Sequence, residues 1–173
     1  MNARRDYLLK ELRILAWNAS VQRAKPYKEG REAASEDTRL FRESLVSYLS
    51  SQVVPGYSQG GLEEERHYKH IDDLADYANS VGDKVLGHLG YKYGVAQKLL
   101  NLALKYHWCL DVIAEPPHCP VDRFVIDRTR YKGKINWTEI KYRSEYQSII
   151  EDIKRQAGTR SIAMWELSIY SRR

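Results

Sequence analysis

The sequence predicts an all-α fold. Apolar residues recur at helical spacing in several separate segments, and no segment sustains the alternation of apolar and polar residues that marks a strand. Glycine and proline fall between these segments, where helices would end. A chain of 173 residues is long enough to bury a core without disulfides or metals. We therefore expect one helical domain over residues 1–173, with segment 53–61 as the best candidate for a boundary between lobes.

The N-terminal half predicts three helices, over residues 4–22, 36–53 and 63–80. Leucines at helical spacing define one face of the first helix. Either Ser35 or Asp37 would cap the second helix, because short polar side chains satisfy the free N–H groups of a first turn. The third helix is strongly charged. We interpret it as a solvated helix with two exposed histidines, His67 and His70.

The C-terminal half predicts four helices, over residues 95–110, 121–131, 137–157 and 161–170. Apolar residues cover most of the circumference of the first of these, and a helix that is apolar nearly all round is buried. At about 100° per residue, Lys98, Asn101 and Lys105 form one narrow stripe above Gly94. The stripe is either a partly exposed face with snorkelling lysines or a polar cleft along a buried helix.

Charge is uneven along the chain. The total is +5, with +4 over residues 1–35, −5 over residues 36–84 and +6 over residues 85–173. Clustered lysine and arginine are typical of a face that binds a polyanion such as DNA, although a solvated surface of mixed charge gives the same counts. Thirteen tyrosines and four tryptophans favour nucleic acid slightly, because aromatic rings stack on bases.

The same composition bears on location and partners. Two cysteines in 173 residues indicate a reducing compartment, and we expect a cytoplasmic protein. The first residues mix charges with apolar side chains, which is unlike the apolar core of a signal peptide. No run approaches the roughly 18–20 apolar residues of a membrane span. We expect a monomer without a membrane partner or cofactor, and no metal site, because no His and Cys spacing resembles a zinc framework.

Two short motifs flank the predicted buried helix. Gly90 and Gly94 precede it, and free N–H groups at the start of a helix bind phosphate, although ordinary turns carry such glycines too. After the helix, a proline-rich loop leads to Pro120-Val121-Asp122 at the start of another helix. Taken alone, Asp122 would be a cap that stabilises the first turn.

Together these motifs resemble a known family. The segment GYKYGVAQKLLNLALKYHWCLDVIAEPPHCPVDRFVID, residues 90–127, is similar to the helix-hairpin-helix DNA glycosylase superfamily and most like its archaeal 8-oxoguanine DNA glycosylase branch. The glycine hairpin, the Gln97-Lys98 pair, a second lysine seven residues later and the Pro-Val-Asp turn carry the resemblance. It implies a two-lobed helical domain with a helix-hairpin-helix and a central cleft.

The resemblance also implies a chemistry. Lys98 would be the nucleophile and Asp122 its partner, acting on a base flipped out of the DNA. Attack of the lysine on the sugar C1′ gives a Schiff base, whose collapse would nick the strand. On this interpretation five residues contact DNA and three aromatic residues are candidates for stacking on the flipped base. The DNA contacts are Gly90, Lys92, Gly94, Lys105 and Arg123, and the stacking candidates are Trp17, Trp108 and Trp137.

Two other functions remain open. A catalytically inert nucleic-acid-binding helical module explains the charge and the aromatic residues without a buried lysine. A helical ribonuclease of the toxin or defence type would use Arg66 and His70, which lie one helical turn apart and could bind and cleave a phosphodiester.

Overall fold

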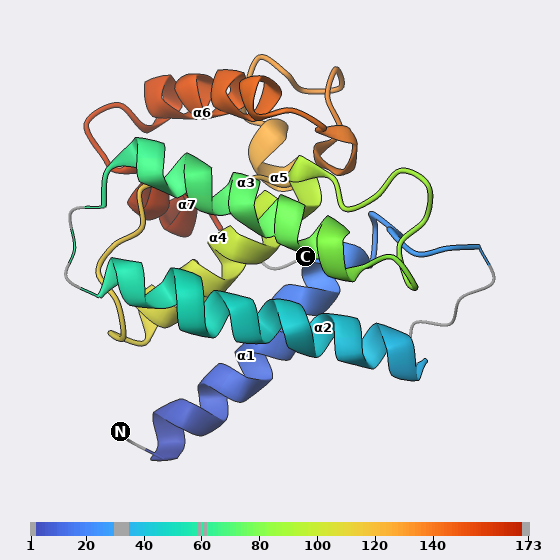
Figure 1. Ribbon diagram of the computed structural model, residues 1–173. Helices are drawn as coiled ribbons and strands as arrows, with labels where there is room; N and C mark the ends of the chain where they lie inside the picture. The colour runs from blue at the N-terminus through green and yellow to red at the C-terminus, as the bar shows by residue number, and fades with distance from the viewer. Residues whose placement is uncertain (1–2, 30–34, 59, 61, 171–173) are drawn as a thin grey trace.

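The computed structural model describes residues 3–29, 35–58, 60 and 62–170. Seven α-helices and no strand are present among these residues, which confirms the predicted all-α fold (Figure 1). The helices are α1 (Ala3–Val21), α2 (Glu36–Tyr48), α3 (Glu64–Val81), α4 (Tyr93–Cys109), α5 (Arg123–Ile126), α6 (Arg143–Ala157) and α7 (Ile162–Ile169). None of the helices in these ranges is long and apolar enough to cross a membrane.

The N-terminal helices follow the sequence prediction closely. The Ser35 hydroxyl caps α2 by accepting the Thr38 N–H at 3.3 Å, which decides between the two predicted caps. A π-helical turn, η1 (Leu49–Val53), and a 3₁₀ turn, η2 (Val54–Tyr57), continue α2 toward the predicted boundary segment. Residues 59 and 61 of that segment lie outside the described residues. Buried side chains from both sides of it, such as Leu45 and Ile71, belong to the same hydrophobic cluster.

Two predicted helices are wrong in extent. Only Arg123–Ile126 is helical within 121–131, and beyond it the Arg130 N–H is donated to the Asp152 carboxylate on α6. The predicted 137–157 helix is two elements: a 3₁₀ turn, η3 (Trp137–Glu139), and α6. The backbone at Ile140 is extended between them, and its carbonyl accepts the Gly94 N–H. In both places contacts with distant segments override local helix propensity.

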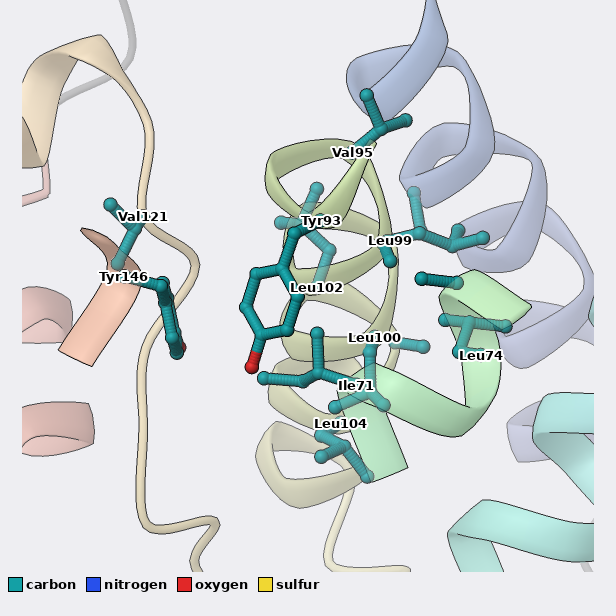
Figure 2. Close-up of a cluster of buried hydrophobic side chains, with 14 of the residues drawn as sticks. Ile71, Leu74, Tyr93, Val95, Leu99, Leu100, Leu102, Leu104, Val121 and Tyr146 are labelled. Atoms are coloured by element: carbon teal, nitrogen blue, oxygen red, sulfur yellow. The ribbon is translucent and has the colours of Figure 1, made fainter. Parts of the chain in front are cut away.

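Helix α4 lies in the middle of the molecule and carries the core. Every side chain from Tyr93 to Leu104 is buried, as its nearly continuous apolar surface predicts. Helices α1 and α3 pack against it, and Figure 2 shows leucines of α4 meeting Ile71 and Leu74 of α3. Val121 lies across from another face of α4. A buried helix therefore holds the polar stripe that the sequence singled out.

Gly94 fixes how closely α4 approaches η3. A methyl group on Gly94 would overlap the Trp137 carbonyl oxygen and contact Ile140. The Gly94 N–H is donated to the Ile140 carbonyl at 3.0 Å. Glycine is needed here for a close backbone approach, which places Trp137 beside the first turns of α4.

Candidate active site

Lys98 and Asp122 form an ion pair. The Lys98 Nζ lies 2.7 Å from the Asp122 Oδ2, which joins α4 to the N-cap residue of α5. The other carboxylate oxygen, Oδ1, accepts the Val125 N–H at 3.1 Å. Asp122 therefore caps a helix and partners a lysine at the same time. The side chain of Lys98 is 7% exposed and that of Asp122 is 33% exposed, so water reaches the pair from the aspartate side.

A cleft of about 330 Å³ opens beside this pair. Its walls come from the end of α1, from α4, from the start of α5, from η3 and from α7, so five segments far apart in the sequence meet there. The lining residues are Ala19, Gln22, Arg23, Lys98, Asp122, Arg123, Phe124, Trp137, Glu166 and Tyr170. The cleft combines an amine, carboxylates, guanidinium groups and three aromatic side chains.

Of the three predicted tryptophans, only Trp137 lines the cleft. The Lys98 Nζ lies 5.9 Å from the centre of its ring. Trp17 is buried in the core in edge contact with Phe41, and Trp108 is partly buried outside the cleft lining. Trp17 and Trp108 are therefore wrong as cleft residues, because apolar packing of α1 and α4 turns them elsewhere.

Sequence reasoning missed two aromatic walls of the cleft, Phe124 and Tyr170. Phe124 follows Asp122 by two residues, and this spacing could have suggested it. Tyr170 comes from the end of α7, and only tertiary packing brings it to the cleft. No local signal marked it, because an aromatic residue at a helix end is usually an ordinary packing residue.

The rest of the polar stripe, Asn101 and the partly buried Lys105, has partners within the protein. The Lys105 Nζ lies 2.6 Å from the Glu166 Oε2 and 4.6 Å from the centre of the Tyr170 ring. Its side chain is 12% exposed. Asn101 is fully buried and donates a hydrogen bond to the Tyr146 hydroxyl at 3.0 Å. Of the two interpretations of the stripe, the partly exposed face with snorkelling lysines does not fit Lys98, whose amine is held by Asp122, and Lys105 instead pairs with a residue of α7.

The predicted phosphate-binding hairpin has its hydrogen bonds filled within the protein. Gly90 has a positive φ of 65°, and its N–H is donated to the Gly87 carbonyl at 3.0 Å. The Gly94 N–H bonds to Ile140, and Lys92 pairs with Glu139 at 2.6 Å. The two glycine amides are thus not free for phosphate, in contrast to the expectation. To bind a phosphate, Lys92 would first have to break its ion pair with the exposed Glu139.

Two arginines at the cleft have more freedom. The Arg123 side chain is 73% exposed, lines the cleft, and lies 3.8 Å from Asp127 at its nearest approach. Arg23, at the end of α1, is exposed and lines the same cleft, but the sequence analysis did not single it out. A guanidinium binds phosphate through paired N–H groups. These side chains give the cleft mouth positive charge.

The histidines form a second polar cluster away from the cleft. The Tyr57 hydroxyl lies 2.8 Å from His67 Nδ1 and 3.1 Å from His70 Nδ1. His67 is fully buried, so the interpretation of two exposed histidines is wrong. Burial lowers the pKa of both rings below the usual value. Arg66 remains exposed on the same helix.

No group of three or more histidine, cysteine or carboxylate side chains is arranged to hold a metal within the described ranges. Comparisons of this chain with protein families, with curated proteins and with solved structures give no match.

Proposed function

We propose that this protein is a DNA glycosylase that excises a damaged or modified base after flipping it into the cleft, with Lys98 as nucleophile. The observation that carries the proposal is the contact of 2.7 Å between Lys98 and Asp122 at the wall of an aromatic-lined cleft. The cleft volume of about 330 Å³ lies at the lower end of the range for small-molecule sites. Trp137, Phe124 and Tyr170 offer faces on which a flipped base would stack.

The pair supplies both parts of a nucleophilic displacement. Asp122 would take a proton from the Lys98 ammonium, leaving a neutral amine. The amine nitrogen attacks the sugar C1′, the bond from C1′ to the base breaks, and its electron pair leaves with the base. The proton held by Asp122 passes to the departing base. The carboxylate then faces the positive charge that develops on the sugar and stabilises it.

Schiff-base formation requires one further proton transfer. Asp122 would move a proton from the attached nitrogen to O4′ as the C1′–O4′ bond breaks, which leaves a protonated imine between Lys98 and C1′. Asp122, a carboxylate again after this transfer, would take a proton from C2′. A C2′–C3′ double bond forms as the C3′–O bond breaks, which expels the 3′ phosphate and nicks the strand. Water hydrolyses the remaining imine and frees the lysine.

A catalytically inert nucleic-acid-binding module is the second candidate. It is favoured by the use of both Asp122 oxygens in structural contacts, one to Lys98 and one to the Val125 N–H. Such a pair is retained in a fold whether or not it reacts, because removing one partner leaves the other charge uncompensated. The two candidates share DNA binding and differ only in whether Lys98 forms a covalent bond.

Borohydride trapping separates the two candidates. The reagent reduces a Schiff base to a stable secondary amine, so wild-type protein should become covalently attached to DNA that carries the right lesion. Lys98→Gln should abolish the adduct, because glutamine retains length without a nucleophilic amine. Lys105→Gln is the matched comparison, since it removes another ion-paired lysine of the same helix and should reduce adduct formation less than Lys98→Gln does. A panel of oxidised, alkylated and modified bases covers the unknown substrate.

An adduct that persists in Lys98→Gln would place the nucleophile elsewhere. The absence of any adduct across the panel, with DNA binding intact, would favour the inert module. If both lysine variants lose the adduct because they fail to fold, Lys98→Met provides a folded variant without the amine. Methionine also lacks the amine, but it suits a buried site.

A further inference from the structure

The side chain of Gln97 forms hydrogen bonds with both the N–H and the carbonyl of Val121. The Gln97 Nε2 donates to the Val121 carbonyl at 2.7 Å, and the Val121 N–H is donated to the Gln97 Oε1 at 3.1 Å. The same Nε2 also donates to the Gly94 carbonyl at 3.0 Å. Gln97 and Val121 are both fully buried. A side-chain amide thus pairs with both backbone polar groups of one residue, in the way that a neighbouring strand would.

The orientation of this amide follows from its partners. A backbone N–H only donates, so the group facing the Val121 N–H must be the Gln97 oxygen. The Val121 and Gly94 carbonyls only accept, so the Gln97 nitrogen must face them. The reversed orientation would oppose donors to donors and acceptors to acceptors in a buried site, where unsatisfied groups are costly.

The contact between Gln97 and Val121 lies next to the proposed reactive pair. Lys98 follows Gln97 on α4, and Asp122 follows Val121 in the chain. Two consecutive residues of the helix therefore contact two consecutive residues of the segment that leads into α5. A shift of Val121 along α4 would move the Asp122 carboxylate away from the Lys98 amine. Hydrogen bonds within α5 cannot prevent such a shift, because α5 is one turn long.

A buried chain of hydrogen bonds anchors Gln97 in turn. Asn101 Nδ2 donates to the Gln97 Oε1 at 3.3 Å and to the Tyr146 hydroxyl at 3.0 Å. The Tyr146 hydroxyl then donates to His118 Nδ1 at 3.1 Å, which leaves Nε2–H of a neutral His118 to donate to Glu64 at 2.8 Å. Tyr146 lies across from the start of α4, beside Tyr93 (Figure 2). These hydrogen bonds link α4 to α6, to α3 and to the proline-rich loop.

We propose that Gln97 is a positioning residue that sets the distance between Lys98 and Asp122 by pairing with Val121, an inference that rests on the function proposed for Lys98. Gln97 does not reach the substrate itself, because the cleft lining does not include it. Its effect is on the rate of the chemical step and not on DNA affinity.

Gln97→Leu removes the hydrogen bonds with Val121 and fills a similar volume with an apolar side chain. Adduct formation by this variant should slow by roughly 10²-fold, as expected for a reacting group misplaced by about 1 Å. DNA affinity should stay within about twofold of wild type, since no phosphate contact changes. Leu104→Met is the matched control, because it alters another fully buried side chain of α4, two turns further on, that makes no hydrogen bond.

Gln97→Glu gives a readout that a general loss of stability would not produce. A protonated glutamic acid can donate to the Val121 carbonyl and accept its N–H, whereas the ionised carboxylate can only accept. Adduct formation by this variant, relative to wild type at the same pH, should therefore recover several-fold as the pH falls from about 8 to about 6. A relative rate that does not change over this range would overturn the proposal.

Hydrogen exchange at the Val121 amide tests the positioning without any catalytic readout. Exchange should accelerate in Gln97→Leu by at least about tenfold and stay unchanged in Leu104→Met. Equal exchange in both variants overturns the proposal, as does wild-type adduct formation by Gln97→Leu. If wild-type protein forms no adduct, the proposed function fails, while faster Val121 exchange in Gln97→Leu alone still establishes that Gln97 holds the segment carrying Asp122.

Discussion

At the level of single residues, Asp122 has the most unusual combination of contacts. One oxygen accepts a backbone N–H of α5, and the other accepts the Lys98 ammonium. A third of its side chain is exposed to the cleft, so a substrate could reach it. Lys98 is held by α4 and has little room to move. In the proposed reaction the helix fixes the nucleophile, and the more exposed aspartate moves the proton.

Asp122→Asn separates these two contacts. Asparagine can still accept the Val125 N–H, so the cap should survive. The Lys98 ammonium loses its counter-charge, and the free energy of unfolding should fall by about 1–3 kcal/mol. Base excision should slow by about 10²–10³-fold, as when one electrostatic stabiliser is removed. DNA affinity should stay the same or rise, because a carboxylate near phosphates repels them.

Single-turnover kinetics and urea denaturation measure these effects of Asp122→Asn separately. Val125→Ala is a suitable comparison, because it destabilises α5 without touching the carboxylate. An excision rate for Asp122→Asn that falls no further than that of Val125→Ala would remove the chemical role of Asp122.

At the level of the elements, the position of η3 against α4 is decided by glycine. The Gly94 N–H and the Ile140 carbonyl are 3.0 Å apart, and no side chain fits between the two backbones. This contact brings Trp137 to the cleft wall beside Lys98. The glycine that the sequence suggested as a phosphate ligand therefore contributes to the site in another way, as a packing residue.

Gly94→Ala should reduce stability by about 3 kcal/mol, at the upper end of the usual cost of overpacking, because the neighbouring atom is backbone and cannot rotate away. Gly56→Ala in η2 is the control. Its added methyl group would make only an ordinary contact with His70, so its stability should change by less than about 1 kcal/mol. Urea denaturation of both variants gives the comparison. Equal stability of the two would mean that η3 is free to move away from α4.

At the level of the whole molecule, several buried histidines couple folding to pH. Burial is the largest cause that lowers the pKa of His67, His107 and His118 below the usual value of 6.5. A hydrogen bond from His118 is the largest cause that lowers the pKa of Glu64 to about 2. The unfolded chain therefore binds more protons than the folded protein as the pH falls below 6.5, so acid favours unfolding.

Stability should accordingly fall as the pH drops from about 7.5 to about 5.5, by up to about 1.4 kcal/mol per pH unit for each histidine that stays neutral when folded. Glu64 adds a further loss at lower pH, between its ordinary pKa of 4.5 and about 2. His67→Gln should flatten the dependence of stability on pH, because it removes the most deeply buried of these rings. Urea midpoints at several pH values provide the measurement. If stability depended on pH equally steeply in wild type and in His67→Gln, burial of His67 would not contribute to the acid sensitivity.

The charge of the whole molecule predicts its response to salt. DNA affinity should fall steeply as salt rises, because each neutralised phosphate releases counterions. Arg123→Glu at the cleft mouth should reduce the magnitude of the log–log salt slope by about 1. Arg39→Glu, an exposed residue of α2 outside the cleft lining, should have little effect. Fluorescence anisotropy with single-stranded and duplex DNA measures both. No DNA binding at low salt would remove the glycosylase and the inert module together.

The sequence by itself determined the helices and the candidate pair. Helical periodicity and punctuation by glycine and proline are local, so they located most elements within a few residues, and the apolar circumference of α4 predicted its burial. Spacing on that helix also singled out Lys98, and the Pro-Val-Asp turn singled out Asp122.

Only the tertiary structure decided what surrounds the pair. Phe124 and Tyr170 line the cleft, while Trp17 packs into the core, because the packing of α1, α4 and α7 sets which faces meet. Lys105 is paired with Glu166, 61 positions away, and Gln97 with Val121, 24 positions away. Sequence periodicity reports which face of a helix is buried, but a hydrogen bond depends on distance and angle between segments that local patterns do not relate.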